Sequence, residues 1–540
     1  MKERWKLVFE KRRKLFMKTD LLFIILFAIA ATYYYDSVLT KGPLNTHLWK
    51  QTDCLSLTRN FSRGASFFSP EMNSQLGDKF RSGHTASEFP VLYYIVGMIW
   101  KFFGESYVSY RLFYLMILFA GLFAFYKSIK LLFEDAFWAA ALSVLLFTSP
   151  VYVVYGVSFI PDVPAFSFIL VALYYFLRYS LEKKSRLFLL SMAFFALAGL
   201  IKVSSLIAFV SLLCVFLLEV FSVKTLINRK LFRCNRLEWA GFISVIIIVF
   251  SWYSYVDYYN ALHGFKSTLN SASPIWQLEK GAFLPLVKGI KNFTSYVFFS
   301  RPVLMILLLI GIANLFLIKK MPLFAYISNI LIILGGATYF ILWTPLLDVH
   351  DYYFIALLIL FAGILMPFTW FVKTRYPVIF KGNFLKILLG VFLLYNFLYC
   401  QSVVRLKTVA QKGDYIVVGN HEFVAGMQWT NWDVDRNWKR FGSMKPYILQ
   451  LGIKAEDKVI SLPDKSPNVS LFLMDRKGWT DNLNYSKSED IRKLIQCGAK
   501  YLLVSDPEFL KQGFLQAFLT QKIGSYKGIE IFKLSEHQGI

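Results

Sequence analysis

The chain has 540 residues, of which 56% are hydrophobic and 18% aromatic, a composition too apolar for a water-soluble protein. Its net charge of +25 does not indicate nucleic acid binding, because the lysines and arginines lie in short segments between apolar runs, as in membrane proteins with positive-inside topology. The five cysteines are scattered without a CxxC pair and predict neither a disulfide framework nor a metal site. We therefore expect a polytopic α-helical membrane protein, since a helix satisfies its own backbone in lipid.

Eleven apolar segments predict transmembrane helices. They are expected at residues 21–38, 108–127, 136–155, 163–179, 187–201, 204–221, 238–256, 302–318, 321–342, 352–372 and 384–401. The segments that this count places in the cytoplasm are rich in lysine and arginine: 1–19, 127–135, 178–186, 224–236, 319–320 and 373–386. The outer loops 156–162 and 343–351 contain neither residue, so the N-terminus is expected in the cytoplasm and the C-terminus on the outer side.

Residues 44–90 form a polar stretch that is too long for a turn between two helices, and loops of that length are usually functional or disordered. Interleaved aromatic residues argue against disorder. The segment Phe89–Phe103 is apolar, but counting it as a span would invert every later loop. We expect it to be a helix along the outer membrane interface that closes a first outer loop of about residues 39–107. Residues 257–300 are expected to form a second loop on the outer surface.

After residue 401 the composition becomes that of a soluble protein. The sequence thus predicts two domains, a membrane domain at 1–401 and a small α/β domain at 402–540 on the outer face. Within the second domain, Ser486 with Glu489 is typical of a helix-capping box, and Gly498 is expected to end that helix. Strands are expected at Tyr501–Val504 and Ile529–Leu534, and a further helix at Asp506-Pro507. The domain shows no catalytic motif.

Ionisable and hydrogen-bonding residues gather in the expected outer loops beside apolar flanks. An unpaired charge costs about 2.5–3.5 kcal/mol at the bilayer centre and less near the surface. The candidates for a functional site are His47, Asp53, Arg59, Glu88, Asp162, Lys202, Arg301, His350, Asp351 and Tyr352. The alternative for each is a structural role, such as a helix cap, an ion pair or a lysine that reaches back to water. The sequence has no Gly-rich phosphate loop, HExxH motif or serine nucleophile elbow, so it supports neither soluble nucleotide chemistry nor proteolysis.

A series of short motifs occurs in one order along the chain: HLWKQTD ending at Asp53, LTRNF around Arg59, EFP at Glu88, FIPDVPAF around Asp162, the turn at Lys202, and HDYY from His350. The series resembles bacterial GT-C glycosyltransferases, in the branch of the protein mannosyltransferases and the lipid A aminoarabinose transferase. The resemblance covers roughly residues 20–400, and the C-terminal domain matches by position alone. Where the relatives have a lysine and a second proline, this chain has Phe89 and a single Pro90.

The resemblance implies a GT-C-like membrane domain with a small periplasmic domain, and a sugar donor linked to polyprenyl phosphate that is used on the outer side with inversion. It implies that Asp53 is the general base and that Glu88 and Asp162 are further catalytic carboxylates. Substrate-binding roles are expected for Lys202, His350, Tyr352, Asp351, His47, Arg59 and Arg301. Polyprenyl phosphate leaves as a stabilised anion, so this chemistry needs a base on the acceptor hydroxyl and cations where the phosphate charge grows.

The expected partners are the donor, a lipid, glycan or protein acceptor, and the lipid bilayer, without nucleic acid. The expected location is the bacterial inner membrane. No cofactor is expected, and since Asp53 has no adjacent acid and Asp162 is single, we expect catalysis without a metal, although some relatives recruit a divalent cation. The alternative function is a transporter or flippase of a lipid-linked glycan. Charges on one membrane face and the lack of an internal sequence repeat favour the enzyme.

Overall fold

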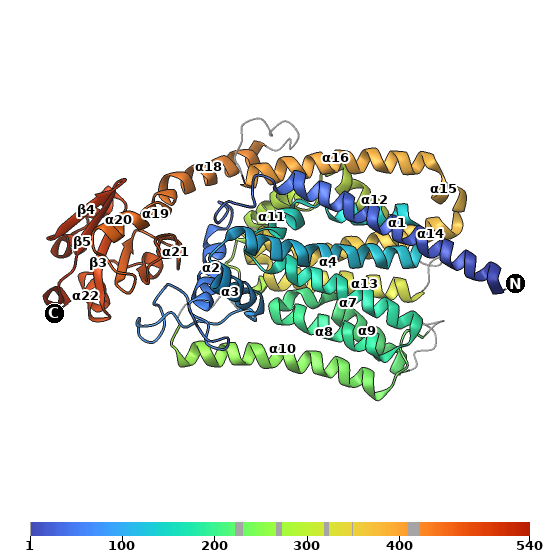
Figure 1. The fold of residues 1–540 in the computed structure, drawn as a ribbon, viewed down its shortest axis with the longest axis horizontal. Coiled ribbons are helices and arrows are strands. Elements are labelled where there is room, and N and C mark those ends of the chain that lie inside the picture. Colours follow the sequence, from blue (N-terminus) through green and yellow to red (C-terminus); the bar gives the residue numbers. More distant parts are fainter. Residues whose placement is uncertain are drawn as a thin grey trace.

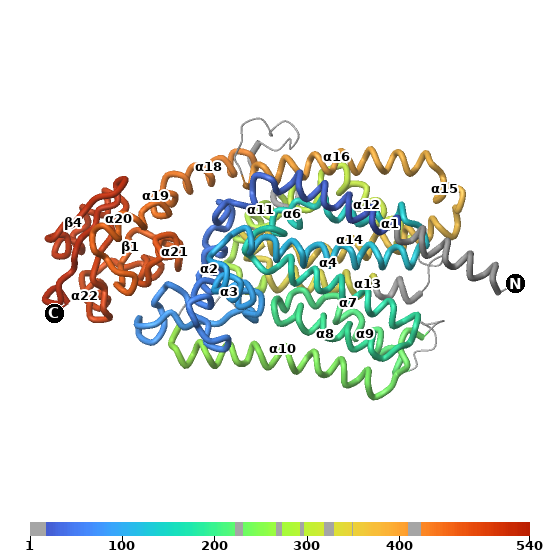
Figure 2. Tube along the Cα trace, viewed as in Figure 1, coloured from blue at the N-terminus to red at the C-terminus, as the bar shows by residue number. Residues whose placement is uncertain are grey.

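The computed structural model describes residues 2–221, 230–265, 273–317, 323–347, 349–408 and 421–539. Long helices run side by side in a bundle, and a smaller domain with a β-sheet lies beyond one end of it (Figure 1). The N-terminus lies at the opposite end. Figure 2 shows that two short helices, α2 (Leu48–Ser62) and α3 (Val91–Phe103), lie at the same end as the small domain. We call this the domain-bearing end of the bundle.

Helices occupy all the positions at which the sequence predicts membrane spans. They are α1 (Lys2–Tyr35), α4 (Tyr107–Phe133), α5 (Ala136–Leu146) with α6 (Pro150–Gly156), α7 (Asp162–Glu182), α8 (Ser185–Ile201), α9 (Ile207–Val220), α10 (Arg236–Leu262), α12 (Arg301–Phe316), α13 (Leu323–Leu347), α14 (Leu358–Arg375) and α16 (Asn383–Thr408). Within the described ranges, 8 helices are long and apolar enough to cross a membrane. The apolar pair α5 and α6 is bent by 75° where Pro150 begins α6, as in a broken span or a re-entrant loop, while α8 and α12 are apolar but shorter.

Segments that are expected in the cytoplasm meet at the end opposite the small domain. Lys127 and Lys130 both pair with Asp20, at nitrogen–oxygen distances of 2.7 and 2.6 Å. Lys386 pairs with Asp135 at 3.6 Å. The expected segment 319–320 and residues 224–229 of the segment 224–236 lie outside the described residues. The gathering of basic residues at one end supports the predicted alternation of the helices.

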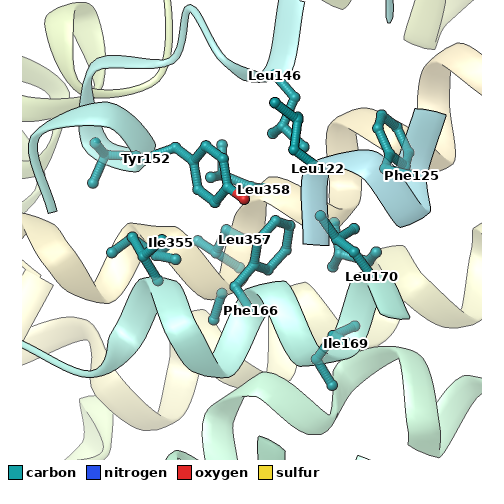
Figure 3. Close-up of a cluster of buried hydrophobic side chains, with 14 of the residues drawn as sticks. Leu122, Phe125, Leu146, Tyr152, Phe166, Ile169, Leu170, Ile355, Leu357 and Leu358 are labelled. Carbon is teal, nitrogen blue, oxygen red and sulfur yellow. The ribbon is translucent and has the colours of Figure 1, made fainter. Parts of the chain in front are cut away.

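Apolar side chains from helices far apart in the sequence form the main core inside the bundle. Figure 3 shows a part of it where α4, α5, α6 and α7 meet the 3₁₀ helix η4 (Asp351–Leu357) and the start of α14. Helices α4 and α7 approach closely because Gly121 has no side chain: a Cβ there would lie 2.6 Å from the Cα of Ser167. This packing fixes the starts of α7 and η4, which carry Asp162 and Asp351.

Helix α3 packs on α2 and is not one of the long helices of the bundle, as the sequence predicts. Gly97 permits the close contact, since a Cβ there would lie 2.8 Å from the Cβ of Phe61. On the opposite side of α3, Phe102 and Phe103 are 76% and 86% exposed. Such a helix, with one face on protein and one apolar face exposed, is typical of a membrane interface.

The surface loop expected at 257–300 is largely helical instead. Helix α10 continues to Leu262, and α11 (Phe283–Val297) follows, with residues 266–272 outside the described ranges. The amphipathic pattern of this stretch is therefore a property of helix faces rather than of an irregular loop.

The C-terminal domain is built around a five-stranded sheet in the order β2-β1-β3-β5-β4. The strands are β1 (Lys458–Leu462), β2 (Gly478–Thr480), β3 (Ala499–Val504), β4 (Lys522–Tyr526) and β5 (Ile529–Lys533). Strand β1 is parallel to both of its neighbours, whereas β5 is antiparallel to β3 and β4. The helices are α18 (His421–Asn437), α19 (Lys439–Gly442), α20 (Lys445–Gln450), α21 (Val469–Met474), α22 (Ser488–Gln496) and α23 (Pro507–Leu510). The two predicted strands correspond to β3 and β5.

Two details of this domain differ from the sequence prediction. The boundary after residue 401 falls inside α16, which continues to Thr408 because its last turns pack against protein. The N-cap of α22 is Lys487 and its capping-box partner is Asp490, rather than Ser486 with Glu489. The Oδ2 of Asp490 accepts the backbone N–H groups of Ser486 (3.3 Å) and Lys487 (3.2 Å). Gly498 does follow this helix, in the left-handed conformation with a φ of 98°.

Candidate active site

Helix α2 is the structural centre of the first outer loop. His47, directly before it, has a left-handed backbone with a φ of 53° and a ψ of 42°. Residues 51–61 are all buried, because α3 and α21 of the C-terminal domain both pack against α2. Four side chains of α2 at helical spacing line a cavity of about 30 Å³, enough for an ordered water. They are Lys50, Asp53, Cys54 and Leu57.

A buried ion pair joins α2 to the end of the first outer loop. The Nζ of Lys50 lies 2.8 Å from the Oε1 of Glu88, and the hydroxyl of Ser87 donates to the Oε2 of Glu88 at 2.5 Å. Burial alone would raise the pKa of Glu88, but Lys50 and Lys202 outweigh it and lower that pKa to about 2. Burial would lower the pKa of Lys50, but Glu88 holds it above its usual range. Both groups are therefore charged at neutral pH.

Asp53 is a buried carboxylate on the same face of α2. Its Oδ1 has no hydrogen-bond partner among the residues that the structure describes. Burial raises the pKa of Asp53 to about 7, with Lys50 opposing the rise and Glu88 and Asp464 adding to it. A carboxylate with a pKa near neutral and an unused oxygen has the properties of a general base.

Lys202 follows α8 and pairs with Asp162, the first residue of α7. The Nζ of Lys202 lies 3.3 Å from the Oδ1 of Asp162. The same ammonium group lies 4.7 Å from the ring centroid of Tyr353 and 5.7 Å from that of Tyr352. The Oδ2 of Asp162 is buried and lacks a partner within the described part of the chain. The pair therefore keeps an unsatisfied acceptor beside a cation and two aromatic rings.

Asp351, at the start of η4, is the centre of a second buried ionic cluster. Its Oδ1 lies 2.9 Å from the Nε2 of His47 and also accepts the hydroxyl of Tyr155, while its Oδ2 pairs with Lys407. The ring of His47 lies 4.9 Å from the ring of Tyr352, centroid to centroid. The two clusters are therefore contiguous.

His350 lies between these clusters as an uncharged ring. Its centroid is 5.4 Å from that of Tyr352 and 5.7 Å from that of Tyr353. Burial, together with the nearby His47, lowers the pKa of His350 to about 4, so the imidazole is neutral at physiological pH. Its Nδ1 is buried and has no partner among the described residues. A neutral imidazole of this kind can donate or accept one hydrogen bond to a ligand.

The structure brings most of the predicted site residues together at the domain-bearing end, with two exceptions. The guanidinium of Arg59 binds both carboxylate oxygens of Glu105, at 2.7 and 3.0 Å, and the carbonyl of Phe472, at 2.8 Å. Two of its donors bind Glu105 of the first outer loop and one binds Phe472 of the C-terminal domain, so we assign Arg59 to the contact between the loop and the domain. Arg301 begins α12 with an exposed side chain, and its substrate-binding role stays a prediction.

Three residues of the site are missed by sequence reasoning. Lys50 lies three positions before Asp53, a helical spacing that could have pointed to it. Tyr155 lies in an apolar run without any polar signal. Lys407 lies after the fall in hydropathy at residue 401, in the part of the chain assigned to the soluble domain. Its side chain nevertheless is buried against Asp351.

Comparisons with known proteins address the fold and the activity. Residues 85–255 match the family model of dolichyl-phosphate-mannose-protein mannosyltransferases. Two crystal structures of ArnT from Cupriavidus metallidurans, one in the apo state and one bound to undecaprenyl phosphate, match with TM-scores of 0.54 and 0.56. Each is 13% identical to this chain, and each match covers 95% of this chain and 98% of the other. Among curated protein sequences, none matches significantly.

The chain has the GT-C fold, and the family matched by residues 85–255 is one of membrane glycosyltransferases. The family match over 85–255 contains four residues of the site, Glu88, Tyr155, Asp162 and Lys202. Asp53 and Asp351 lie on either side of it in the sequence. The chain therefore assembles its candidate site from the matched region and from flanking segments, which are joined to it by ion pairs and ring contacts.

Proposed function

We propose that this glycosyltransferase takes its sugar from a donor linked to polyprenyl phosphate and transfers it to a hydroxyl group by direct displacement with inversion. The observation that carries the proposal is the buried polar cluster at the domain-bearing end, where lysines, carboxylates and aromatic rings meet the ends of the apolar helices. Such a place suits an amphiphile whose tail lies in the bilayer and whose phosphate lies at the bilayer surface. One of the ArnT structures with this fold is bound to undecaprenyl phosphate, a lipid of that class.

The donor phosphate is assigned to Lys202 and its neighbours. The ammonium group is held by Asp162 and by the ring of Tyr353, so it is positioned before a ligand arrives. Phosphate charge grows as the sugar leaves, and a preorganised cation stabilises that charge without reorganisation. The neutral His350 and the hydroxyl of Tyr352 supply hydrogen bonds on the same side.

Asp53 is assigned as the general base. In the displacement, the acceptor oxygen forms the new bond to the anomeric carbon, the bond from that carbon to the phosphate oxygen breaks, and the acceptor proton passes to Asp53. The phosphate leaves as an anion and needs no proton from an acid. Because Glu88 is ionised, it keeps Lys50 charged near Asp53, and the charge of the lysine favours the ionised form of the Asp53 carboxylate.

Orientation and metal use follow from charge. The basic residues at the end opposite the small domain support a cytoplasmic location for that end. We propose that the site and the C-terminal domain face the periplasm of a bacterial inner membrane. Each acid at the site lies near a lysine or histidine, and the described residues contain no group of three or more histidine, cysteine or acidic side chains that could hold a metal ion. We therefore propose catalysis without a metal, with a lipid, glycan or protein hydroxyl as acceptor.

Binding of undecaprenyl phosphate to the purified full-length protein in nanodiscs tests the donor site. We expect saturable binding that Lys202→Met weakens at least about tenfold, since it removes a charge-assisted contact to phosphate. The double variant Lys202→Met/Asp162→Asn, in which no buried acid is left unpaired, should bind equally weakly. Lys477→Met is the matched control, because this lysine pairs with Glu71 on the C-terminal domain boundary. Absence of binding to the native protein, or equal binding by all variants, would contradict the proposal.

A further inference from the structure

The C-terminal domain reaches the cavity beside Asp53. Pro467, which is buried, lines that cavity together with Asp53 and Lys50. The next residue, Asn468, is fully buried and donates from Nδ2 to the carbonyl of Thr52 at 3.2 Å. Thr52 directly precedes Asp53, so this hydrogen bond holds the backbone of the proposed base.

The segment Asp464–Ser470, which we call the domain turn, has a fixed shape. The carboxylate of Asp464 accepts the backbone N–H groups of Ser466 at 2.8 Å and of Ser470 at 3.0 Å, and it accepts both of their hydroxyls as well. A turn stapled at both ends by one buried carboxylate can present its middle residues in a constant position. The negative charge of Asp464 also contributes to the raised pKa of Asp53.

Further contacts dock the domain on residues 59–75 of the first outer loop. The guanidinium of Arg59 stacks over the ring of Phe472 at 3.9 Å. Asn73 donates from Nδ2 to the carbonyl of Arg476 at 3.1 Å. The indole of Trp479 donates to the carbonyl of Gln75, also at 3.1 Å. The domain is therefore seated on the loop over a broad area, and the position of the domain turn over Asp53 is determined by it.

The two sides of Asp53 differ in chemistry. On the membrane side lie the Lys50–Glu88 pair and, beyond it, Lys202 at the ends of the membrane helices. On the other side lies the domain turn, with Asn468, whose Oδ1 is buried without a partner among the described residues. A donor lipid enters from the bilayer and uses the first side. The second side is polar and belongs to the water-facing domain. Because the donor uses the first side, the second side is available to the acceptor.

We propose that the domain turn is the acceptor-side wall of the active site, and that the acceptor hydroxyl reaches Asp53 from the water-facing side, between the first outer loop and the C-terminal domain. The proposal rests on the function proposed above. Pro467 lines the cavity on that side, and Asn468 is a positioning residue that fixes Asp53 through Thr52. The acceptor that fits is a hydroxyl on a hydrated group, such as a sugar, rather than one within a lipid tail.

Alkylation of Cys54 in the full-length protein tests the wall without any substrate. Cys54 lines the cavity, its Sγ lies 3.3 Å from the hydroxyl of Tyr93, and burial raises the pKa of its thiol to about 12. Opening the wall admits both reagent and water, and both speed the reaction because the thiolate is the reactive form. We expect Pro467→Gly and Asn468→Ala to raise the rate of labelling by iodoacetamide at least about fivefold, as measured by peptide mass spectrometry.

Two controls make the outcome decisive. Lys477→Ala loosens the same domain boundary away from the cavity and should leave the rate at Cys54 unchanged. Cys400, fully buried in the bundle, reports general unfolding and should stay unlabelled in every variant. Equal rates at Cys54 in Pro467→Gly, Asn468→Ala and Lys477→Ala would overturn the inference. So would a tenfold loss of undecaprenyl phosphate binding in Pro467→Gly, because the wall would then belong to the donor. If the native protein bound no undecaprenyl phosphate, the proposed function would fail instead.

Discussion

Lys50 and Glu88 can both be charged in a buried place because each stabilises the other. A buried ion is expensive when alone, and an opposite charge at 2.8 Å offsets most of that cost. The pair also sets the field around Asp53, since the lysine favours its ionised form and the glutamate opposes it. The pKa of the proposed base therefore depends on the opposing effects of Lys50 and Glu88 rather than on one interaction.

Removal of one member of this pair is expected to destabilise the protein strongly. Glu88→Gln leaves the Lys50 ammonium buried without a carboxylate, at a cost of about 3–5 kcal/mol. The double variant Lys50→Met/Glu88→Gln should regain most of that stability, because it leaves no lone charge. Thermal unfolding in detergent is the measurement, with Glu71→Gln as control: the Glu71–Lys477 pair is partly exposed, and its loss should cost at most about 1 kcal/mol. Equal midpoints for Glu88→Gln and Glu71→Gln would refute this account of the pair.

Among the elements, α2 has the most demanding position, because one short helix carries the proposed base on one face and the domain contact on others. Arg59 makes the contact with the C-terminal domain through the carbonyl and the ring of Phe472, and Glu105 holds its guanidinium in place. Planar, multidentate contacts of this kind need arginine rather than lysine.

Arg59→Met should therefore loosen α2 and α21 together while leaving the membrane helices intact. Hydrogen–deuterium exchange of the full-length protein measures this: we expect amide protection in Leu48–Ser62 and Val469–Met474 to fall at least about tenfold, since local opening becomes easier. Arg59→Lys should lower amide protection about as much as Arg59→Met, because a lysine lacks the planar guanidinium that donates to Glu105 and Phe472 at once. Unchanged protection in α21 would show that other contacts alone hold the domain.

The membrane helices could be predicted from sequence because hydropathy and charge asymmetry act locally. Individual site residues such as Asp162 and Lys202 could be found as well, since a lone charge at the end of an apolar run stands out. The partners of the site residues could not be predicted, because they come from segments distant in sequence. Lys407, for example, pairs with Asp351 from another helix. The three-residue strand β2 could not be predicted either, since it forms a strand only through its pairing with β1. The end of α16 was misplaced because protein, not lipid, covers its last turns.

At the scale of the whole molecule, the C-terminal domain lies beyond the end of the helix bundle at which α2 lies (Figure 1). In the proposed function, the donor reaches Lys202 at the end of the bundle helices, and the acceptor reaches Asp53 beside Pro467 of the C-terminal domain. Orientation of two amphiphilic substrates on opposite sides of one base supplies much of the catalytic advantage, because it replaces a bimolecular encounter by a positioned one.

The most direct test of the central claim is glycosyl transfer from polyprenyl-phosphate sugars in reconstituted vesicles, compared between the native chain and Asp53→Asn over a range of pH. A base acts in its deprotonated form, so native transfer should rise with pH and level off above a pKa of about 7. Asp53→Asn keeps the shape of the side chain and should reduce transfer at least about a hundredfold at the plateau. Full transfer by Asp53→Asn with the same pH profile would contradict the account and move the search for the base to Asp162.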